Sequence, residues 1–384
     1  MRNLSDTINR LSSLRAMRSG VGSAVPGPSA RLSSLEGFGS NPGMLGAKVH
    51  VPPNLKTNAP LVVVLHGCMQ TAETYAEGTG WLRLADEHGF ALLFPQQQRS
   101  NNANLCFNWF VPAHCQRDCG EPLAIRQMIA AMVANHGIDE KSIFITGLSA
   151  GGAMTSVMLA TYPEVFAGGA VIAGLPYNCA RTMPEAFDQM RGHIHLTERE
   201  LQNRVRDAST HRGPWPTISV WHGTADHTVS DSNAEATVTQ WRGVHDVDAA
   251  PSNVTNSRGW TRRRWNGSDG TVVIEQYQII GMGHGTPITA GTGAGDGIPG
   301  PFVLDVGVSS TRILAASWKL APIVDQTPVG LSDDAVKGRL LEAKPTSASP
   351  GEPSAQTTGA AAYQQIRSIK QKIENALQAA GLMR

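Results

Sequence analysis

The sequence predicts an α/β fold with a mostly parallel sheet and helices on both faces. Strand-like apolar runs alternate with helix-like runs from about residue 46 to residue 322, as strands and crossover helices do in a parallel sheet. Within this region, an apolar strand leads through a Gly-x-Ser-x-Gly motif at residues 147–151 directly into a helix. The 384 residues suffice for one large α/β domain with appended segments.

The expected strands are short apolar runs bounded by Gly, Pro or polar clusters. They fall at residues 61–66, 90–95, 142–146, 168–173, 217–221 and 271–280. The expected helices are longer runs in which apolar residues recur at helical spacing. They fall at residues 81–87, 122–135, 152–161, 234–242 and 309–318.

The two ends of the chain differ in composition from residues 46–322. Residues 1–45 contain an amphipathic helical pattern (Leu4, Ile8, Leu11) followed by a Gly/Ser/Pro-rich lead-in from about residue 21. Residues 323–362 have the composition of a flexible linker. Residues 363–384 predict a second amphipathic helix, with Ile366 and Ile369 on its apolar face. Because so short a helix is marginal alone, it is expected to pack on the domain, on a second copy in a homodimer, or on an apolar particle.

Composition excludes several classes of function. Lys and Arg total 32 against 31 Asp and Glu, a net charge of +1, so no electrostatic footprint for nucleic acid exists. No apolar run reaches the 18 or so residues of a spanning helix, so no integral membrane segment is expected. The N-terminus lacks the pattern of a secretory signal and the five cysteines contain no C-x-x-C pair, which favours a cytoplasmic protein without a zinc site.

Ser149 is the candidate nucleophile. It is the central residue of Gly147-Leu148-Ser149-Ala150-Gly151, between an apolar strand and a helix. At such a turn the glycines relieve crowding, and the serine oxygen is pushed out over the edge of the sheet. The alternative interpretation is a Gly-rich structural turn.

A serine nucleophile needs a base and an orienting acid, which in this arrangement follow it as acid and then histidine. Asp226 comes just after the strand at residues 217–221 and a glycine turn, at the edge where active sites of open α/β sheets gather. His284 lies in the Gly-rich loop after the strand at residues 271–280. Histidine exchanges protons near neutral pH, so His284 is the expected base.

Other residues could compete for these roles. Asp231, Asp269 and Asp305 are rival acids, but each lies within or after a polar loop. His66 and His222 precede glycines at strand ends, and His193 and His195 form an H-x-H pair without a third ligand at metal spacing; these are interpreted as structural histidines. We therefore expect no metal and no cofactor.

Ester cleavage also requires donors for the developing oxyanion. The backbone amide of Ala150, directly after the serine, is one expected donor. The other is the amide of Cys68, because the strand at residues 61–66 ends in His66-Gly67-Cys68, where the glycine allows the backbone to turn inward.

The motifs together resemble the polyhydroxybutyrate depolymerase family of esterases, whose relatives include feruloyl and acetylxylan esterases. The resemblance covers most of residues 46–320 and is carried by LHGCMQTAETY (65–75), GWLRLADEHGFALLFPQQ (80–97), CFNWF (106–110), ITGLSAGGAM (145–154), YPEVFAGGAVIAGLPY (162–177) and HGTAD (222–226). It implies an α/β-hydrolase fold with Ser149, Asp226 and His284 as catalytic triad and the amides of Cys68 and Ala150 as oxyanion hole.

The resemblance adds expectations for other residues. It implies that Trp109 lies near the acyl site, against the alternative of a core aromatic residue. It places Cys68 and Cys106 close together, where either a disulfide or two thiols can exist; we expect thiols, because no export signal is recognised. Residues 178–214, with helical patterns at 183–190 and 198–207, occupy the position of an α/β-hydrolase cap, or else form an ordinary crossover.

The expected activity is that of a serine ester hydrolase acting on poly(3-hydroxybutyrate) or its short oligomers, with the polymer granule surface as a further partner. The enzymatic alternative is a carbohydrate esterase that removes feruloyl or acetyl groups. A granule-associated interaction protein is the alternative from another class. Relatives also suggest a secreted protein as the alternative to a cytoplasmic one.

Overall fold

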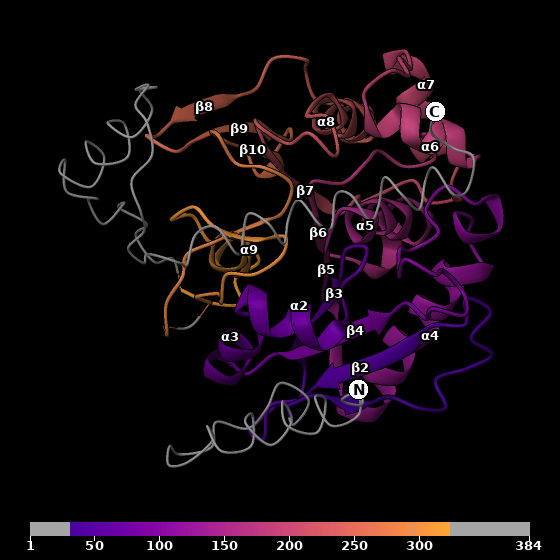
Figure 1. The fold of residues 1–384 in the computed structure, drawn as a ribbon, viewed down its shortest axis with the longest axis vertical. Coiled ribbons are helices and arrows are strands. Elements are labelled where there is room, and N and C mark those ends of the chain that lie inside the picture. The colour runs from indigo at the N-terminus through magenta and orange to yellow at the C-terminus, as the bar shows by residue number, and fades with distance from the viewer. Residues whose placement is uncertain (1–30, 294, 323–384) are drawn as a thin grey trace, which may run out of the picture. The chain divides into compact units, whose positions relative to one another are not determined.

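The computed structural model describes residues 31–293 and 295–322, and the expected helices in residues 1–30 and 363–384 lie outside this part. Within it, ten strands form one sheet in the order β1-β2-β4-β3-β5-β6-β7-β10-β9-β8 (Figure 1). Their bounds are β1 Ser33–Ser34, β2 Gly46–His50, β3 Ala59–Leu65, β4 Ala91–Gln96, β5 Ile138–Leu148, β6 Gly168–Ile172, β7 Thr217–Gly223, β8 Asn253–Asn256, β9 Trp260–Asn266 and β10 Val272–Ile279.

The central strands β4, β3, β5, β6, β7 and β10 are parallel, and β1, β2, β9 and β8 extend the sheet with antiparallel pairs. A separate parallel pair joins β11 (Thr286–Ile288) to β12 (Val303–Asp305). The helices are α2 Ala72–Thr79, α3 Trp81–His88, α4 Gly120–His136, α5 Ala150–Thr161, α6 Met183–Met190, α7 Glu198–Arg206, α8 Ser232–His245 and α9 Ser310–Ser317. The predicted α/β-hydrolase architecture, with its mostly parallel sheet, is confirmed.

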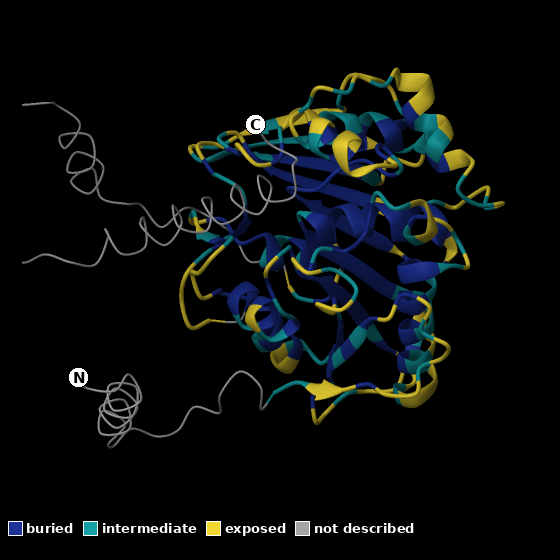
Figure 2. Cartoon of the chain, turned by 45° about the vertical axis from the view of Figure 1, so that its right-hand side comes forward, coloured by how far each residue is buried: buried dark blue, intermediate teal, exposed yellow. Residues whose placement is uncertain are grey.

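The core consists of two layers, one on each face of the sheet. Alternate residues of β3 divide between them: Leu61, Val63 and Leu65 pack with α4, α5 and α8, whereas Val62 and Val64 pack with α2, α3 and α9. Figure 2 shows the central strands buried and the exposed residues gathered at the periphery. Burial on both faces explains why these strands are continuous apolar runs in the sequence.

Several elements were not predicted, and their sequences show why. In β9, the run Arg262-Arg263-Arg264 does not have the apolar pattern of a strand. Arg262 lies over the Trp260 ring at 5.8 Å, and Arg263 and Arg264 form ion pairs with acidic residues of α8 and β10. Because the guanidinium groups of these arginines have aromatic or acidic partners, their aliphatic carbons can lie along the sheet surface.

Residues 31–45 are not a loose lead-in where the structure describes them. Leu35 and Leu45 are buried in the core. Asn41 donates to the Leu45 carbonyl at 2.8 Å and accepts from the Leu45 amide at 3.0 Å. The segment is attached to the sheet by the antiparallel pairing of β1 with β2 and by the Leu35 amide, which donates to the Ala47 carbonyl at 3.0 Å.

The helices α6 and α7 of residues 178–214 join the helical layer beside α8. Gln240 of α8 donates to the Leu201 carbonyl of α7 at 3.1 Å, and Gln189 of α6 donates to Asn233 at 2.8 Å. This packing favours the crossover interpretation of the segment over a cap.

The turn from β5 into α5 depends on close backbone contact. A Cβ atom on Gly151 would lie 2.5 Å from the carbonyl oxygens of Leu65 and His66, and one on Gly147 would overlap the Gly151 backbone. Only glycine at both positions therefore lets α5 begin directly against the end of β3.

We predict that Gly147→Ala lowers the free energy of unfolding by about 1 to 3 kcal/mol, because the added methyl group overpacks a backbone contact. Urea unfolding measures the change. The matched control is Gly259→Ala, where an added Cβ meets no atom within 4 Å. Equal effects of the two substitutions would contradict the role given to this turn.

Candidate active site

Ser149 occupies a strained turn at the carboxyl end of β5. Its backbone has φ 56° and ψ −118°, a region that non-glycine residues rarely adopt. The turn is held by its own amide, which donates to the Ile172 carbonyl at 2.9 Å, and by its carbonyl, which accepts from Ala153 at 2.8 Å. The residue is half-buried, and these hydrogen bonds maintain its strained backbone at the carboxyl end of β5.

Asp226 and His284 are brought together from separate loops, as the sequence predicts. Nδ1 of His284 lies 2.7 Å from Oδ2 of Asp226. The other carboxylate oxygen, Oδ1, accepts hydrogen bonds from the amides of Thr228 and Val229, both at 2.9 Å. The Asp226 side chain is fully buried, while that of His284 is 10% exposed. Nδ1 is thus engaged by the carboxylate, and Nε2 of His284 makes no hydrogen bond within the described part of the chain.

His222 makes a further contact with Asp226. Its Nε2 lies 3.3 Å from Oδ2 of Asp226 and 2.9 Å from the Val229 carbonyl oxygen. Both neighbours are acceptors, so Nε2 carries a hydrogen. Nδ1 is buried and has no hydrogen-bond partner in the described part of the chain, so a second proton there would be unpaired. His222 is therefore a second hydrogen-bond donor to Asp226. Its i to i+4 spacing in HGTAD is the sequence signal that could have indicated this contact.

These donors decide the charge of Asp226. Burial alone would raise the pKa of its carboxyl group, but the hydrogen bonds from His222, His284 and the Val229 amide outweigh burial and hold the pKa below its ordinary value. Asp226 is thus an anion that fixes the orientation of the His284 ring.

The two backbone amides expected to bind the oxyanion take no part in the hydrogen bonds of the described fold. The amides of Cys68 and Ala150 have no hydrogen-bond partner among the residues described. The turn that carries Cys68 is nonetheless firmly held, because the Gly67 amide donates to Gln70 Oε1 at 2.9 Å. The Ser149 hydroxyl is also without a partner within residues 31–293 and 295–322.

Cys68 and Cys106 form a disulfide, with their Cα atoms 4.3 Å apart. The expectation of two thiols is therefore wrong for this structure. The sequence could not decide the matter, because the pairing depends on the loop after β4 folding back onto the turn after β3. Cys115, Cys119 and Cys179 are free.

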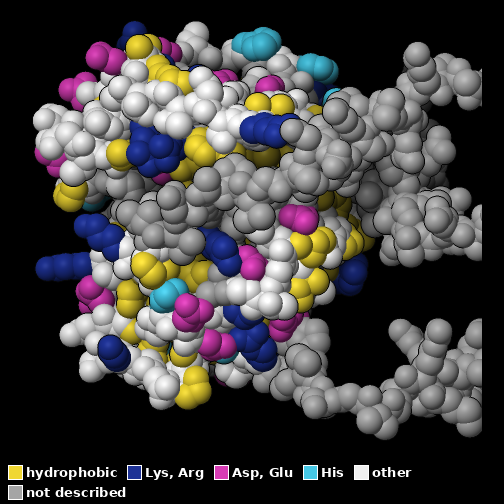
Figure 3. All heavy atoms as spheres, turned by 90° about the vertical axis from the view of Figure 1, so that its left-hand side faces the viewer, with side chains coloured by type: hydrophobic (Ala, Val, Ile, Leu, Met, Phe, Trp, Pro, Cys, Tyr) yellow, Lys and Arg dark blue, Asp and Glu magenta, His cyan; other side chains and the backbone are white. Residues whose placement is uncertain are grey.

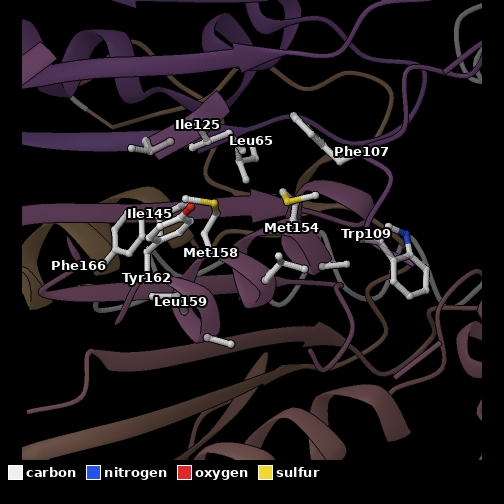
Figure 4. Close-up of a cluster of buried hydrophobic side chains, with 14 of the residues drawn as sticks. Leu65, Phe107, Trp109, Ile125, Ile145, Met154, Met158, Leu159, Tyr162 and Phe166 are labelled. Carbon is white, nitrogen blue, oxygen red and sulfur yellow. The ribbon is translucent and has the colours of Figure 1, made fainter. Parts of the chain in front are cut away.

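Trp109 is 6% exposed and packs edge-to-face on Phe110 with ring centroids 5.3 Å apart. Figure 4 shows it at one end of the core cluster, on the side of Met154. This position agrees with the core interpretation, and a contact with the acyl group stays a prediction.

The rival residues lie elsewhere. Asp231 is exposed at the start of α8, Asp269 accepts from Thr271 in an exposed turn, and Asp305 accepts from Ala290. The His193 side chain is 65% exposed. Across the residues that the structure covers, no group of three His, Cys, Asp or Glu side chains is arranged as a metal site requires. Figure 3 shows basic and acidic side chains interspersed over one face.

In the described residues, no helix is both long and apolar enough to cross a bilayer.

The sequence model described as "Esterase PHB depolymerase" matches residues 45–262, which include Ser149 and Asp226. Poly(3-hydroxyalkanoate) depolymerase C of Paucimonas lemoignei is 46% identical over 282 residues, covering 73% of this chain and 68% of that protein. An acetylxylan esterase of Coprinopsis cinerea is 32% identical, covering 68% and 70%. The solved acetyl xylan esterase from Aspergillus awamori has a TM-score of 0.61 at 27% identity, covering 66% of this chain and 93% of that one.

His66, beneath the Cys68 turn, predicts a pH dependence of stability. Burial lowers the pKa of its ring from 6.5 to about 4. In the folded state the His66 ring therefore resists protonation, whereas in the unfolded state it is protonated below pH 6.5. The stability that the neutral ring contributes is present above pH 6.5 and is lost as the pH falls from 6.5 to about 4. The loss at about pH 4 is on the order of 3 kcal/mol.

Urea unfolding of the wild type and His66→Gln at neutral pH and at about pH 4 tests this. The wild type should lose more stability on acidification than the variant. Parallel losses would assign the acid sensitivity to other groups, such as His245, whose pKa burial lowers in the same way.

Proposed function

Because this chain belongs to the Esterase PHB depolymerase family and is a carboxylic ester hydrolase, we propose that it cleaves poly(3-hydroxybutyrate) or its short oligomers with Ser149, His284 and Asp226. The observation that carries the proposal is the 2.7 Å contact between His284 Nδ1 and buried Asp226, together with the strained turn at Ser149. The substrate class follows from the 46% identity to a poly(3-hydroxyalkanoate) depolymerase.

In the proposed reaction, the Ser149 hydroxyl attacks the ester carbonyl carbon while Nε2 of His284 takes its proton. The negative charge that forms on the carbonyl oxygen is received by the amides of Cys68 and Ala150. The C–O bond to the alcohol then breaks, and His284 gives its proton to the departing alkoxide. Water repeats the sequence on the acyl-enzyme, and Asp226 stabilises the imidazolium in both halves.

The carbohydrate esterase alternative is supported by the acetylxylan esterase relative, because the same residues would cleave acetyl or feruloyl esters. We place Trp109 beside the acyl group in either case. The formal net charge of the chain, only +1, suits both an uncharged polyester and a polysaccharide.

The disulfide bears on where the enzyme works. A Cys68–Cys106 bridge persists in an oxidising compartment, so it favours the secreted alternative over the cytoplasmic one. Mass spectrometry of protein alkylated at lysis distinguishes them, since two alkylated thiols would restore the cytoplasmic interpretation.

We predict that Ser149→Ala folds normally and loses hydrolysis by several orders of magnitude, because the proposed nucleophile is removed. We also predict that Asp226→Asn lowers kcat by about 10⁴, because the amide favours the wrong tautomer of His284. Asp231→Asn, at an exposed position, is the matched control and should retain activity.

Purified protein is assayed on amorphous polymer, soluble 3-hydroxybutyrate oligomers, acetylated xylan and methyl ferulate. Faster cleavage of the first two supports the polyester assignment, and faster cleavage of the last two supports the carbohydrate alternative. Activity that survives in Ser149→Ala would remove the proposed nucleophile.

We further propose that residues 363–384 adsorb to the apolar surface of polyester granules, because burial of their apolar side chains would contribute roughly 1.5 to 3 kcal/mol each before the cost of ordering. Deleting residues 323–384 should leave hydrolysis of a soluble p-nitrophenyl ester intact and weaken granule binding. Unaltered granule binding with a changed solution mass would instead indicate a dimer contact.

A further inference from the structure

A buried carboxylate lies behind the turn that presents Cys68. Glu121, the second residue of α4, is 0% exposed. Its Oε1 accepts from the side-chain amides of Gln97 and Asn108, both at 2.7 Å, and its Oε2 accepts from the Asn108 backbone amide at 2.9 Å. Asn101 adds a longer contact of 3.3 Å. Each of these hydrogen-bond partners is a donor, so both carboxylate oxygens of Glu121 act as acceptors.

No cationic side chain compensates this carboxylate in the described residues. His114, whose Nδ1 lies 3.8 Å away, accepts a hydrogen bond at that nitrogen from the Glu121 backbone amide at 3.3 Å. Burial also lowers the pKa of the His114 ring, so the ring is neutral. Burial raises the pKa of Glu121 to about 7 despite its hydrogen bonds. Above neutral pH, a buried anion is thus held by amides and by the N-terminal end of α4.

The loop that these amides belong to, residues 97–108, is tied to the Cys68 turn at three points. Cys106 forms the disulfide with Cys68. The Met69 amide donates to the Asn104 carbonyl at 2.8 Å. The Gln97 amide donates to His66 Nε2 at 3.2 Å. Movement of this loop would therefore carry the turn with it.

The third tie fixes the peptide group that contains the proposed oxyanion donor. Because Nε2 of His66 accepts from Gln97, its hydrogen is on Nδ1, which donates to the Gly67 carbonyl at 2.8 Å. That carbonyl and the Cys68 N–H belong to one planar trans peptide and point in opposite directions. Holding the Gly67 oxygen on His66 therefore aims the Cys68 N–H away from the core.

We propose that Glu121 is a positioning residue for ester hydrolysis, acting through Gln97 and His66 to hold the Gly67–Cys68 peptide in the orientation that binds the oxyanion. The inference rests on the proposed role of the Cys68 amide. Glu121 does not touch the substrate. Glu121 contributes to stabilisation of the transition state, in which negative charge develops on the carbonyl oxygen. A misdirected Cys68 N–H would weaken binding of this transition state more than binding of the substrate.

The test compares wild type, Glu121→Gln and Glu275→Gln above neutral pH. The first substitution puts an NH₂ donor against donors, while the second makes the same change at a largely buried carboxylate of β10 paired with Arg264. Active sites are titrated with a fluorophosphonate, and kcat, KM and the inhibition constant of a phenylboronic acid are measured on p-nitrophenyl acetate. The boronate forms a tetrahedral serine adduct that uses the oxyanion hole.

Per titrated site, Glu121→Gln should lower kcat about tenfold or more and weaken boronate inhibition by a similar factor, with KM changed by less than about threefold. Glu275→Gln should match the wild type. Glu121→Gln with wild-type kcat and boronate inhibition overturns the proposal. So does a loss that disappears once activity is divided by titrated sites, because that loss is structural.

If Glu121→Gln does not fold, Gln97→Met is the second variant, since it removes the amide that links Glu121 to the Cys106 carbonyl. The same division between kcat and KM is expected, and wild-type constants overturn the proposal. Failure of the proposed function has a different signature. The wild type would then resist the fluorophosphonate, or Ser149→Ala would stay active, whatever Glu121 does.

Discussion

The close approach of α5 to the end of β3 is the contact on which the rest of the site depends. Gly147 and Gly151 allow it, and it forces Ser149 into a backbone conformation that only surrounding structure can maintain. The same contact places the first turn of α5 against the carbonyl oxygens of Leu65 and His66, just before the turn that carries Cys68. Backbone packing thus positions Ser149 and the amide of Ala150, whereas the turn that carries Cys68 is also held by the side chains of His66 and Gln70.

The proposed acid and base are positioned in another way. Asp226 and His284 are on loops, and polar contacts rather than packing determine their geometry. At Asp226, the hydrogen bonds from His222 and His284 and the charge of His284 outweigh burial and lower the pKa. At Glu121, burial outweighs the hydrogen bonds from amides and raises the pKa. Two buried carboxylates within one domain therefore shift in opposite directions, because the balance between burial and their hydrogen-bonding and charged partners differs.

The sequence predicted the parallel strands and the Asp226–His284 pair because both depend on local signals: apolar runs, glycine turns and chain order. It did not predict β9, where arginine stems replace apolar residues, or the Cys68–Cys106 bridge, which joins loops separated by a strand and two helices. The Glu121 cluster was also missed. Asparagine and glutamine in residues 97–108 have the composition of an exposed loop, and only the fold shows that they converge on one carboxylate.

The two edges of the large sheet have a consequence for an enzyme that would gather at high density on a solid substrate. At one edge β1 has only two residues, and at the other β8 has four, Asn253-Val254-Thr255-Asn256, three of them polar. Such short edges offer few unpaired backbone groups in register to a strand of another molecule. Copies that lie close together therefore have little opportunity to pair their sheet edges and aggregate, so a high local density need not inactivate the protein by aggregation.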